Sequence, residues 1–394
     1  MGKWERVKLG DICDVITDGV HNTPKLEIAG VPLLDGADIE NMRIINNNPT
    51  KFISLETDKI LSKRCKPMAN DILVSSRGSI GKIAIVEDQQ DFNIMGNIIL
   101  CRPKQGRLNS KYVGYYLVKN TATLKNTSHG SSQKGLYLSQ MRSFTIPIPP
   151  IEIQKKISQT LDTASELIAL RKKQLAELDN LIKAVFYDMF GDPVINTNKW
   201  KMDNFGDHLV TIDSGWSPKC HDYAAIDGAW GVLKLSAVTS GKFSVMDNKT
   251  LPNDLTPDLS IEVYPGDLLF TRKNTKELVG ACAYVFETQS KLMISDIIFR
   301  LVIKPDLSKI YLWKLFNNEN FKKKIQSIAN GSAGSMPNIS KSRLLLLTIP
   351  VPPIDLQNQF AEVVTKIEEQ KTIVQKAFDE SQYLFDSLMS QYFE

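Results

Sequence analysis

Two long segments of the chain carry apolar residues at the heptad spacing that is typical of coiled-coil helices. They span residues 151–190 and 354–394. The apolar seam consists of Ile157, Leu161, Ile168, Leu175, Leu178 and Ile182 in the first segment, and of Phe360, Val364, Ile367, Val374, Phe378 and Leu388 in the second. Arg171, Lys371 and Ser381 interrupt it. Both seams follow the same register, offset from 157 to 360, so we predict that the two helices pair with each other.

The residues before each long helix have the shorter patterns of a mixed α/β domain. The apolar runs that predict strands, each bounded by Gly, Asn, Asp or Pro, are 83–86, 97–101 and 296–303. The segments with helical spacing are 111–119 and 309–316. We therefore expect an α+β fold with two mixed α/β domains, at 1–150 and 195–353, each followed by one long helix.

A ten-residue motif occurs twice, at the start of each long helix. Residues 145–154 read TIPIPPIEIQ, and residues 348–357 read TIPVPPIDLQ. Weaker matches precede the motif in the same order, pairing 4–19 with 200–215 and 70–75 with 266–271. Adjacent prolines suit the beginning of a helix, because proline lacks the N–H that the first turn leaves unpaired. The repeated order of these motifs predicts a tandem duplication.

The duplication also predicts the direction of the two helices. The first helix leaves the first domain and delivers the chain to the second domain, where the second helix begins. If the helices pack along their full length, the second must run back towards the first domain. We therefore expect an antiparallel two-helix coiled coil, with one domain at each end and an approximate two-fold axis. A helix of some 36 residues would be about 54 Å long.

Length and composition limit the class of protein. A chain of 394 residues exceeds one ordinary core, and 42% hydrophobic with 23% charged residues is typical of a soluble globular protein. Runs of about 18 apolar residues and the apolar stretch of a signal peptide are absent from the sequence, so we expect a cytoplasmic protein without membrane contact. The five cysteines are odd in number and never spaced as C-x-x-C, which argues against a disulfide framework and against a metal site.

The positive charge of the chain lies in the two domains rather than in the helices. Residues 1–150 hold 20 Lys/Arg and 14 Asp/Glu, and residues 195–353 hold 19 and 15. The helical segment 151–190 holds 6 of each, and the segment 354–394 holds 3 and 8. Two basic domains suit a polyanion such as DNA, since neutralised phosphates supply much of the affinity of DNA-binding proteins.

With these features the sequence resembles the specificity (S) subunit of type I restriction–modification enzymes. The resemblance is carried by the duplicated TIP-x-PP motif, the heptad helices after it, the run NDILVSSRGS at 70–79 and its diverged partner at 266–274. It covers essentially the whole chain. In that family each domain is a target recognition domain for one half of a split DNA site, and the paired helices act as a ruler. The resemblance thus implies a non-catalytic subunit that binds double-stranded DNA.

The same resemblance implies the partners of the chain. Two methyltransferase subunits are expected to bind it, to carry S-adenosylmethionine and to methylate adenine, while this chain itself binds no cofactor. Restriction subunits that translocate and cleave DNA are expected to join them. The outer faces of the helices, with 171–173 and 368–369, are expected to dock the partner subunits. The loops differ between the copies, SSRGS at 75–79 against TRKNT at 271–275, which predicts an asymmetric bipartite target.

Polar and basic residues in the loops of each domain are candidate DNA contacts. Arg is suited to guanine, Asn to adenine, and Lys and Ser to phosphate. The candidates of the first domain are His21, Asn22, Lys25, Ser75, Ser76, Arg77, Ser79, Lys82, Ser131 and Lys134. Those of the second domain are Trp216, Lys219, Thr271, Arg272, Lys273, Asn274 and Ser332. The alternatives are a solvated strand edge for the charged residues, ordinary turns for the Gly-rich stretches, and core packing for Trp216.

Two other classes of protein remain as alternatives. A stand-alone DNA methyltransferase would need an N-P-P-[FY] tetrapeptide and a Gly-rich cofactor loop after a strand, and the sequence contains neither. A coiled-coil scaffold would bind proteins, not DNA, with its end domains. Methyl transfer by the purified chain alone would identify the first class, and a sequence-specific footprint would exclude the second.

Overall fold

The computed structural model describes residues 4–45, 49–87, 91–104, 106–127, 135–226, 228–331 and 336–394. The chain divides into two compact units, which are described separately below. Unit 1 comprises Met1–Lys172 and Lys376–Glu394, and unit 2 comprises Lys173–Gln375. Each unit therefore contains one globular domain and parts of both long helices. Within the described ranges, every helix is too short or too polar to span a membrane.

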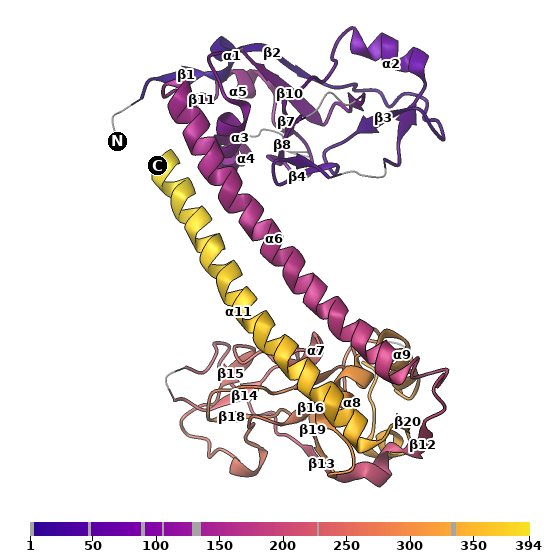
Figure 1. Ribbon diagram of the computed structural model, residues 1–394. Helices are drawn as coiled ribbons and strands as arrows, with labels where there is room; N and C mark the ends of the chain where they lie inside the picture. Colours follow the sequence, from indigo (N-terminus) through magenta and orange to yellow (C-terminus); the bar gives the residue numbers. More distant parts are fainter. Residues whose placement is uncertain are drawn as a thin grey trace. The chain divides into compact units, whose positions relative to one another are not determined.

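The two long helices are α6 (Ile151–Phe190) and α11 (Ile354–Phe393), drawn in magenta and yellow in Figure 1. Both agree with the predicted ranges to within one residue. Each begins directly after a Pro-Pro pair, where the missing proline N–H costs no helical hydrogen bond. The first helix ends at Gly191, whose φ of +73° is the left-handed conformation of a helix C-cap. Local chemistry therefore determines the bounds of α6.

Unit 1 contains short strands, short helices and the first part of α6. Its strands are β1 (Arg6–Lys8), β2 (Cys13–Asp18), β3 (Val31–Leu34), β4 (Ile39–Glu40), β5 (Arg43–Ile44), β6 (Phe52–Ile53), β7 (Ile72–Ser75), β8 (Ile83–Ile85), β9 (Asn93–Ile94), β10 (Ile98–Pro103) and β11 (Thr145–Pro147). Its helices besides α6 and α11 are α1 (Leu9–Ile12), α2 (Leu55–Ser62), α3 (Ser110–Lys119), α4 (Thr121–Thr127) and α5 (Leu138–Ser143). The main sheet is antiparallel, in the order β2-β10-β7-β8.

Unit 2 has the corresponding set of elements. Its strands are β12 (Lys201–Asn204), β13 (Leu209–Ser214), β14 (Gly231–Leu233), β15 (Asn248–Thr250), β16 (Leu268–Thr271), β17 (Cys282–Tyr284), β18 (Leu292–Met293), β19 (Ile298–Ile303) and β20 (Thr348–Val351). Its short helices are η1 (Phe205–His208), α7 (Ser236–Thr239), η2 (Leu259–Ile261), α8 (Lys309–Phe316), α9 (Glu319–Ser327) and α10 (Lys341–Leu345). The main sheet is again antiparallel, in the order β13-β19-β16-β17.

Three sheets of unit 1 have counterparts with the same strand order in unit 2, while the two-stranded sheet β4-β5 belongs to unit 1. Each unit has a four-stranded sheet, a two-stranded sheet that joins its first strand to its last (β1-β11 and β12-β20), and a three-stranded sheet (β6-β3-β9 and β15-β14-β18). In both three-stranded sheets one neighbour is antiparallel and the other is parallel. The segments that match in sequence therefore form matching elements.

Within each unit, the parts of α6 and α11 pack in opposite directions. In unit 2, Phe360 contacts the rings of Phe186 and Phe190, while Lys371 binds Asp179 further from the start of α11. In unit 1, Arg171 donates a hydrogen bond to Ser381. Unit 1 also has one core that contains Ile157 and Leu161 of α6 together with Met389 of α11. The two helix segments in each unit are therefore antiparallel.

The predicted seam residues are all at least partly buried. The buried ones are Ile157, Leu161, Ile182, Phe360, Val364 and Ile367. The half-buried ones are Ile168, Leu175, Leu178, Val374, Phe378 and Leu388. The sequence interpretation omitted Phe186, Phe190 and Met389, which are buried as well. Large side chains next to the heptad positions thus fill the helix–domain contact, because here the helices pack against a domain as well as against each other.

Candidate nucleic-acid interface

The loop after β7 in unit 1 is closed by two buried serines. The hydroxyl of Ser75 donates to the carbonyl of Ser79 and accepts from the main-chain N–H of Lys82 at 2.8 Å. The main-chain N–H of Ser76 donates to the carbonyl of Asn97 at 2.8 Å, and its side chain is 3% exposed. Ser75 and Ser76 are buried in this structure, so their contact with DNA stays a prediction. They hold the loop in shape.

The same loop presents three other predicted residues at the surface. Arg77 and Ser79 are exposed, and Lys82 is half-buried. Gly78 between them has a φ of +68°, which a side chain would strain, so this turn requires glycine. The main chain of Arg77 pairs with that of Gly135. The loop therefore offers a guanidinium group, a hydroxyl group and an ammonium group from one short, well-supported turn.

The corresponding loop after β16 in unit 2 is also supported by buried polar residues. The hydroxyl of Thr271 accepts from the main-chain N–H of Ala281 at 2.9 Å. Asn274 donates to the hydroxyl of Thr239 at 3.1 Å and accepts from the N–H of Thr275 at 2.8 Å. Thr271 is fully buried and Asn274 is 4% exposed, so the contact of these two residues with DNA also stays a prediction.

Arg272 and Lys273 are the accessible members of this second loop. The guanidinium of Arg272 lies over the ring of Phe299, 5.0 Å from its centroid, and Nε donates to Oδ1 of Asn338 at 3.1 Å. The Nζ of Lys341 approaches the same ring at 5.7 Å. Lys273 is exposed. Stacking and one hydrogen bond together hold the plane of the Arg272 guanidinium, which is the group best suited to guanine.

A second pair of loops begins at two positions where only glycine fits, because a side chain would clash with the main chain of a neighbouring segment. A Cβ atom on Gly19 would lie 2.0 Å from the carbonyl oxygen of Ile94, and one on Gly215 would lie 2.0 Å from that of Ile294. Both distances are far inside van der Waals contact. Gly19 and Gly215, which match in the sequence repeat, therefore mark the same close approach of two main-chain segments in each unit.

The predicted residues that follow these glycines are accessible. The exposed ones are His21, Asn22, Lys25 and Lys219. The imidazole Nε2 of His21 lies 3.0 Å from Asp18, within the same loop. Trp216 is 37% exposed, so it is not the fully buried core residue of the alternative interpretation. Cys220 follows Lys219 and is partly exposed, whereas the other four cysteines are buried and all five are free.

Three predicted residues lie outside the described residues. These are Ser131, Lys134 and Ser332. The predicted contacts of the Gly-rich stretches therefore stay predictions.

Sequence reasoning missed the segment that supports the second loop. Asn338 binds Arg272, and its main chain pairs with that of Lys273 and of Asn330. Arg343 donates to Oδ1 of Asn330 at 2.6 Å. The signal in the sequence was the run Ser-Lys-Ser-Arg at 340–343, which places two cations on a short helix directly after the Gly-rich stretch.

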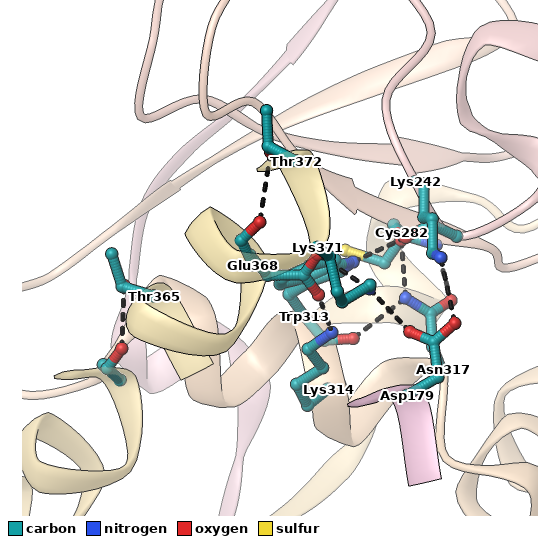
Figure 2. A network of polar contacts seen from close by, with 12 residues as sticks. Asp179, Lys242, Cys282, Trp313, Lys314, Asn317, Thr365, Glu368, Lys371 and Thr372 are labelled. Atoms are coloured by element: carbon teal, nitrogen blue, oxygen red, sulfur yellow. Dashed lines mark hydrogen bonds and ion pairs between the residues drawn. The ribbon is translucent and has the colours of Figure 1, made fainter. Parts of the chain in front are cut away.

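A network of ion pairs between lysine and carboxylate side chains connects the domain of unit 2 to both long helices (Figure 2). Lys242, in the loop after α7, binds Asp179 of α6 at 3.1 Å. Lys371 of α11 binds the same carboxylate at 2.6 Å and Glu368 at 2.8 Å. Lys314 of α8 binds Glu368 at 3.0 Å. The prediction that Glu368 lies on an outer helix face is therefore wrong, and the bond from Arg171 to Ser381 corrects the same prediction for Arg171.

Burial shifts the proton affinity of this network. Burial lowers the pKa of Lys314 to about 8, although Glu368 partly offsets the effect. Burial alone would also lower the pKa of Lys371, but hydrogen bonds to Asp179 and Glu368 hold that pKa above its ordinary value. The network thus contains one amine with a pKa lowered to about 8 and one with a raised pKa.

A cavity of about 510 Å³ lies beside the network in unit 2. Its walls include Asp179 and Phe186 of α6, Lys242, and Trp313 and Asn317 from α8 and the residue after it. Among the described residues, no group of three or more His, Cys, Asp or Glu side chains is placed to hold a metal ion.

Comparison with known proteins shows which proteins the chain is similar to. Residues 1–180 match the family described as "Type I restriction modification DNA specificity domain". The chain is 37% identical over 172 residues to the type I restriction enzyme EcoEI specificity subunit of Escherichia coli, a match that covers 43% of this chain but only 28% of that protein. It is 23% identical over 386 residues to the putative type I restriction enzyme MjaX specificity subunit of Methanocaldococcus jannaschii, covering 93% and 87% of the two chains.

Solved structures share the fold. The S subunit of a type I restriction-modification system from M. genitalium aligns with a TM-score of 0.65 at 12% identity, over 99% of this chain and 96% of that one. A chain from a study of complex assembly in a type I restriction-modification system aligns with a TM-score of 0.54 at 16% identity, over 100% and 98%. The mixed α/β domains with long helices therefore have the same fold as these two chains. The chain is therefore similar to type I restriction–modification specificity subunits, through the domain matched at residues 1–180 and, at lower identity, over most of its length.

Proposed function

We propose that this chain is the DNA-recognition subunit of a type I restriction–modification complex, in which each unit reads one half of an asymmetric bipartite target. The observation that carries this proposal is the combination of equal frames and unequal loops. The two units pair their strands in the same order. Arg77 and Ser79 stand at the surface of one loop, whereas Arg272 and Lys273 stand on its counterpart.

In this proposal the long helices set the distance between the two recognition domains. The parts of α6 and α11 pack in opposite directions inside each unit, which supports one antiparallel coiled coil related by an approximate two-fold axis. Such a coiled coil would hold the two recognition domains at a fixed separation. That separation would define the length of the unread spacer between the half-sites.

The proposal leaves chemistry to the partner subunits. Two methyltransferase subunits would bind this chain, carry S-adenosylmethionine and methylate adenine, and restriction subunits would add translocation and cleavage. The names of the relatives as specificity subunits support a non-catalytic role for this chain. We expect the chain itself to bind DNA and protein but no cofactor.

Methyl transfer from labelled S-adenosylmethionine tests this proposal. We expect transfer to DNA only when the chain and its methyltransferase subunit are both present, at two adenines a fixed distance apart. The chain alone and the methyltransferase alone are the controls. Transfer by the chain alone would identify a stand-alone methyltransferase and overturn the proposal.

A footprint of the same complex tests the remaining alternative. We expect protection of two separated half-sites. The logarithm of the DNA-binding constant should fall linearly with the logarithm of the salt concentration, because binding releases counterions from the DNA phosphates. A complex that assembles but protects no specific sequence would support the protein-binding scaffold instead.

A further inference from the structure

One buried glutamine occurs at the same place in both units, in the first turn of each long helix. Gln154 lies in α6 and Gln357 in α11, and both are fully buried. Both end the repeated ten-residue motif. A fully buried amide must be satisfied by hydrogen bonds, so its partners show what it holds together.

The two amides make the same pair of hydrogen bonds. Oε1 of Gln154 accepts from the main-chain N–H of Asn109 at 2.9 Å, and Nε2 donates to the carbonyl of Pro149 at 2.8 Å. Oε1 of Gln357 accepts from the main-chain N–H of Ser308 at 2.9 Å, and Nε2 donates to the carbonyl of Pro352 at 2.7 Å. In unit 1, Nε2 also donates to the carbonyl of Arg107 at 3.2 Å.

These bonds join the domain to the helix. Asn109 and Ser308 are the N-cap residues of α3 and α8, which pack in the cores of their domains. Their side chains already cap those helices by accepting from Tyr112 and Tyr311, so the glutamines do not serve as the caps. Each glutamine instead links the cap residue of a domain helix to the first turn of a long helix.

A tyrosine reinforces each junction. The hydroxyl of Tyr112 donates to the carbonyl of Pro147 at 2.9 Å, and that of Tyr311 donates to the carbonyl of Pro350 at 2.9 Å. Three segments therefore meet at each junction: the end of the last strand, the start of a domain helix and the start of a long helix. The prolines restrict the backbone of the connection as well.

We infer that Gln154 and Gln357 are positioning residues that fix the direction in which each long helix leaves its domain. This inference rests on the proposed function and adds a consequence to it, namely that the two junctions set how strictly the complex selects the spacer between half-sites. A 40-residue helix is about 60 Å long, so a change of about 3° at its start moves its far end by about 3 Å. That displacement is close to the rise of about 3.4 Å per base pair of DNA.

Leucine is the informative replacement, because it keeps much of the volume but leaves the cap N–H and the proline carbonyl without their partner. The variants are Gln154→Leu and Gln357→Leu. The matched controls are Gln159→Leu and Gln359→Leu, which alter exposed glutamines on the same two helices. Each variant is assembled with wild-type methyltransferase subunit.

The measurement is methylation of duplexes that carry the target mapped for the wild-type complex, with its spacer unchanged or altered by one base pair. We expect Gln154→Leu and Gln357→Leu to reduce the preference for the unchanged spacer by about tenfold, equivalent to about 1.4 kcal/mol. The two control variants should keep the wild-type preference. A purely structural role would lower the melting temperature and the methylation of all duplexes in equal proportion, and that result would overturn the inference.

A second substitution keeps the inference testable if the leucine variants do not fold. Gln154→Glu and Gln357→Glu keep the side-chain shape and the acceptor for the cap N–H but place a carboxylate oxygen against the proline carbonyl. They should show the same loss of spacer preference, and unchanged preference in folded glutamate variants would overturn the inference. Absence of methylation by the wild-type complex would instead refute the proposed function, so the two failures are distinguishable.

Discussion

At the scale of single residues, Lys314 shows how burial changes the chemistry of a side chain in unit 2. Its amine lies 3.4 Å from the centroid of the Trp313 ring and 3.0 Å from Glu368. Burial disfavours the charged amine and lowers its pKa to about 8, whereas the neighbouring Glu368 favours the charge. The folded protein therefore binds a proton at this site less tightly than the unfolded chain does.

We predict that this site makes the stability of the protein depend on pH. Between about pH 8 and the ordinary lysine value of 10.5, the unfolded chain binds more protons at Lys314 than the folded protein does. Stability should therefore rise with pH in this window relative to the Lys314→Met variant, by at most about 2 kcal/mol between pH 8 and 9.5. Urea denaturation of both proteins at these pH values measures the difference.

Lys323→Met is the matched control for this prediction, because Lys323 is exposed on the next helix. The control should differ from the wild type by the same amount at both pH values. If Lys314→Met also showed a constant difference, Lys314 would have the same pKa in the folded and unfolded states.

At the scale of elements, the polar interruptions of the heptad seam are contacts between helices. Lys371 occupies the seam position that Ile168 has in the first helix, yet it is 6% exposed and paired with Asp179 and Glu368. Ser381 is buried and accepts from Arg171. A buried charge is tolerated only with partners, so these residues favour one register of the helix pair in each unit.

We predict a strong coupling between Asp179 and Lys371 in a double-mutant cycle. Asp179→Ala should destabilise unit 2 by about 1–2 kcal/mol, less than for a fully buried pair, because Asp179 is 41% exposed and Glu368 still pairs with the amine. Lys371→Met should cost little, because methionine fills a similar volume in an apolar seam. The double variant should be clearly more stable than Asp179→Ala and about as stable as Lys371→Met, because the buried amine that loses its partner in Asp179→Ala is then absent.

Thermal unfolding of the two single variants and the double variant measures this coupling. Asp188→Ala, which removes an exposed carboxylate from the same helix, is the control. Additive effects of Asp179→Ala and Lys371→Met would show that the pair contributes nothing to the stability of unit 2.

The same elements show which features the sequence could predict. The bounds of α6 and α11 followed from the sequence, since the heptad pattern, the Pro-Pro pairs and Gly191 all act locally. The burial of Ser75 did not, because it depends on how the following loop folds back to bring Ser79 and Lys82 against the hydroxyl. The burial of Asn274 did not either, because its partner Thr239 lies 35 positions away. Lys371 looked like a defect in the seam for the same reason, since its partner Asp179 lies 192 positions away, from 179 to 371.

At the scale of the whole molecule, the chain combines two domains of one design with different surface chemistry. The strand order and the buried glutamine junction are the same in both units. The exposed loops differ: Arg77 is exposed on a glycine turn, whereas Arg272 is stacked on Phe299 and bound to Asn338. Under the proposed function, independent loops on a common frame would allow each half of a target to be read separately.

We predict that Arg77→Ala and Arg272→Ala each change the base preference in one half-site only, and that the two half-sites differ. The loss of one arginine–guanine pair should reduce discrimination at one position by about 1–3 kcal/mol. Arg272 should show the larger effect, because stacking on Phe299 holds its guanidinium in place. Methylation of a library with both half-sites randomised measures each preference.

Lys59→Ala and Lys323→Ala are the controls, since both residues are exposed lysines on helices of the two units, α2 and α9, and lie outside the candidate loops. They should leave base preference unchanged. A change in both half-sites after a single arginine substitution would contradict separate reading by the two units.

The distribution of thiols has a practical consequence. Cys220 is the partly exposed cysteine, and it adjoins Lys219 in a candidate loop of unit 2, while the other four are buried. Partial burial raises its pKa, so coupling to a maleimide dye would be favoured in mildly alkaline buffer. A fluorophore attached there would signal the arrival of a ligand at this loop of unit 2 without any engineered mutation.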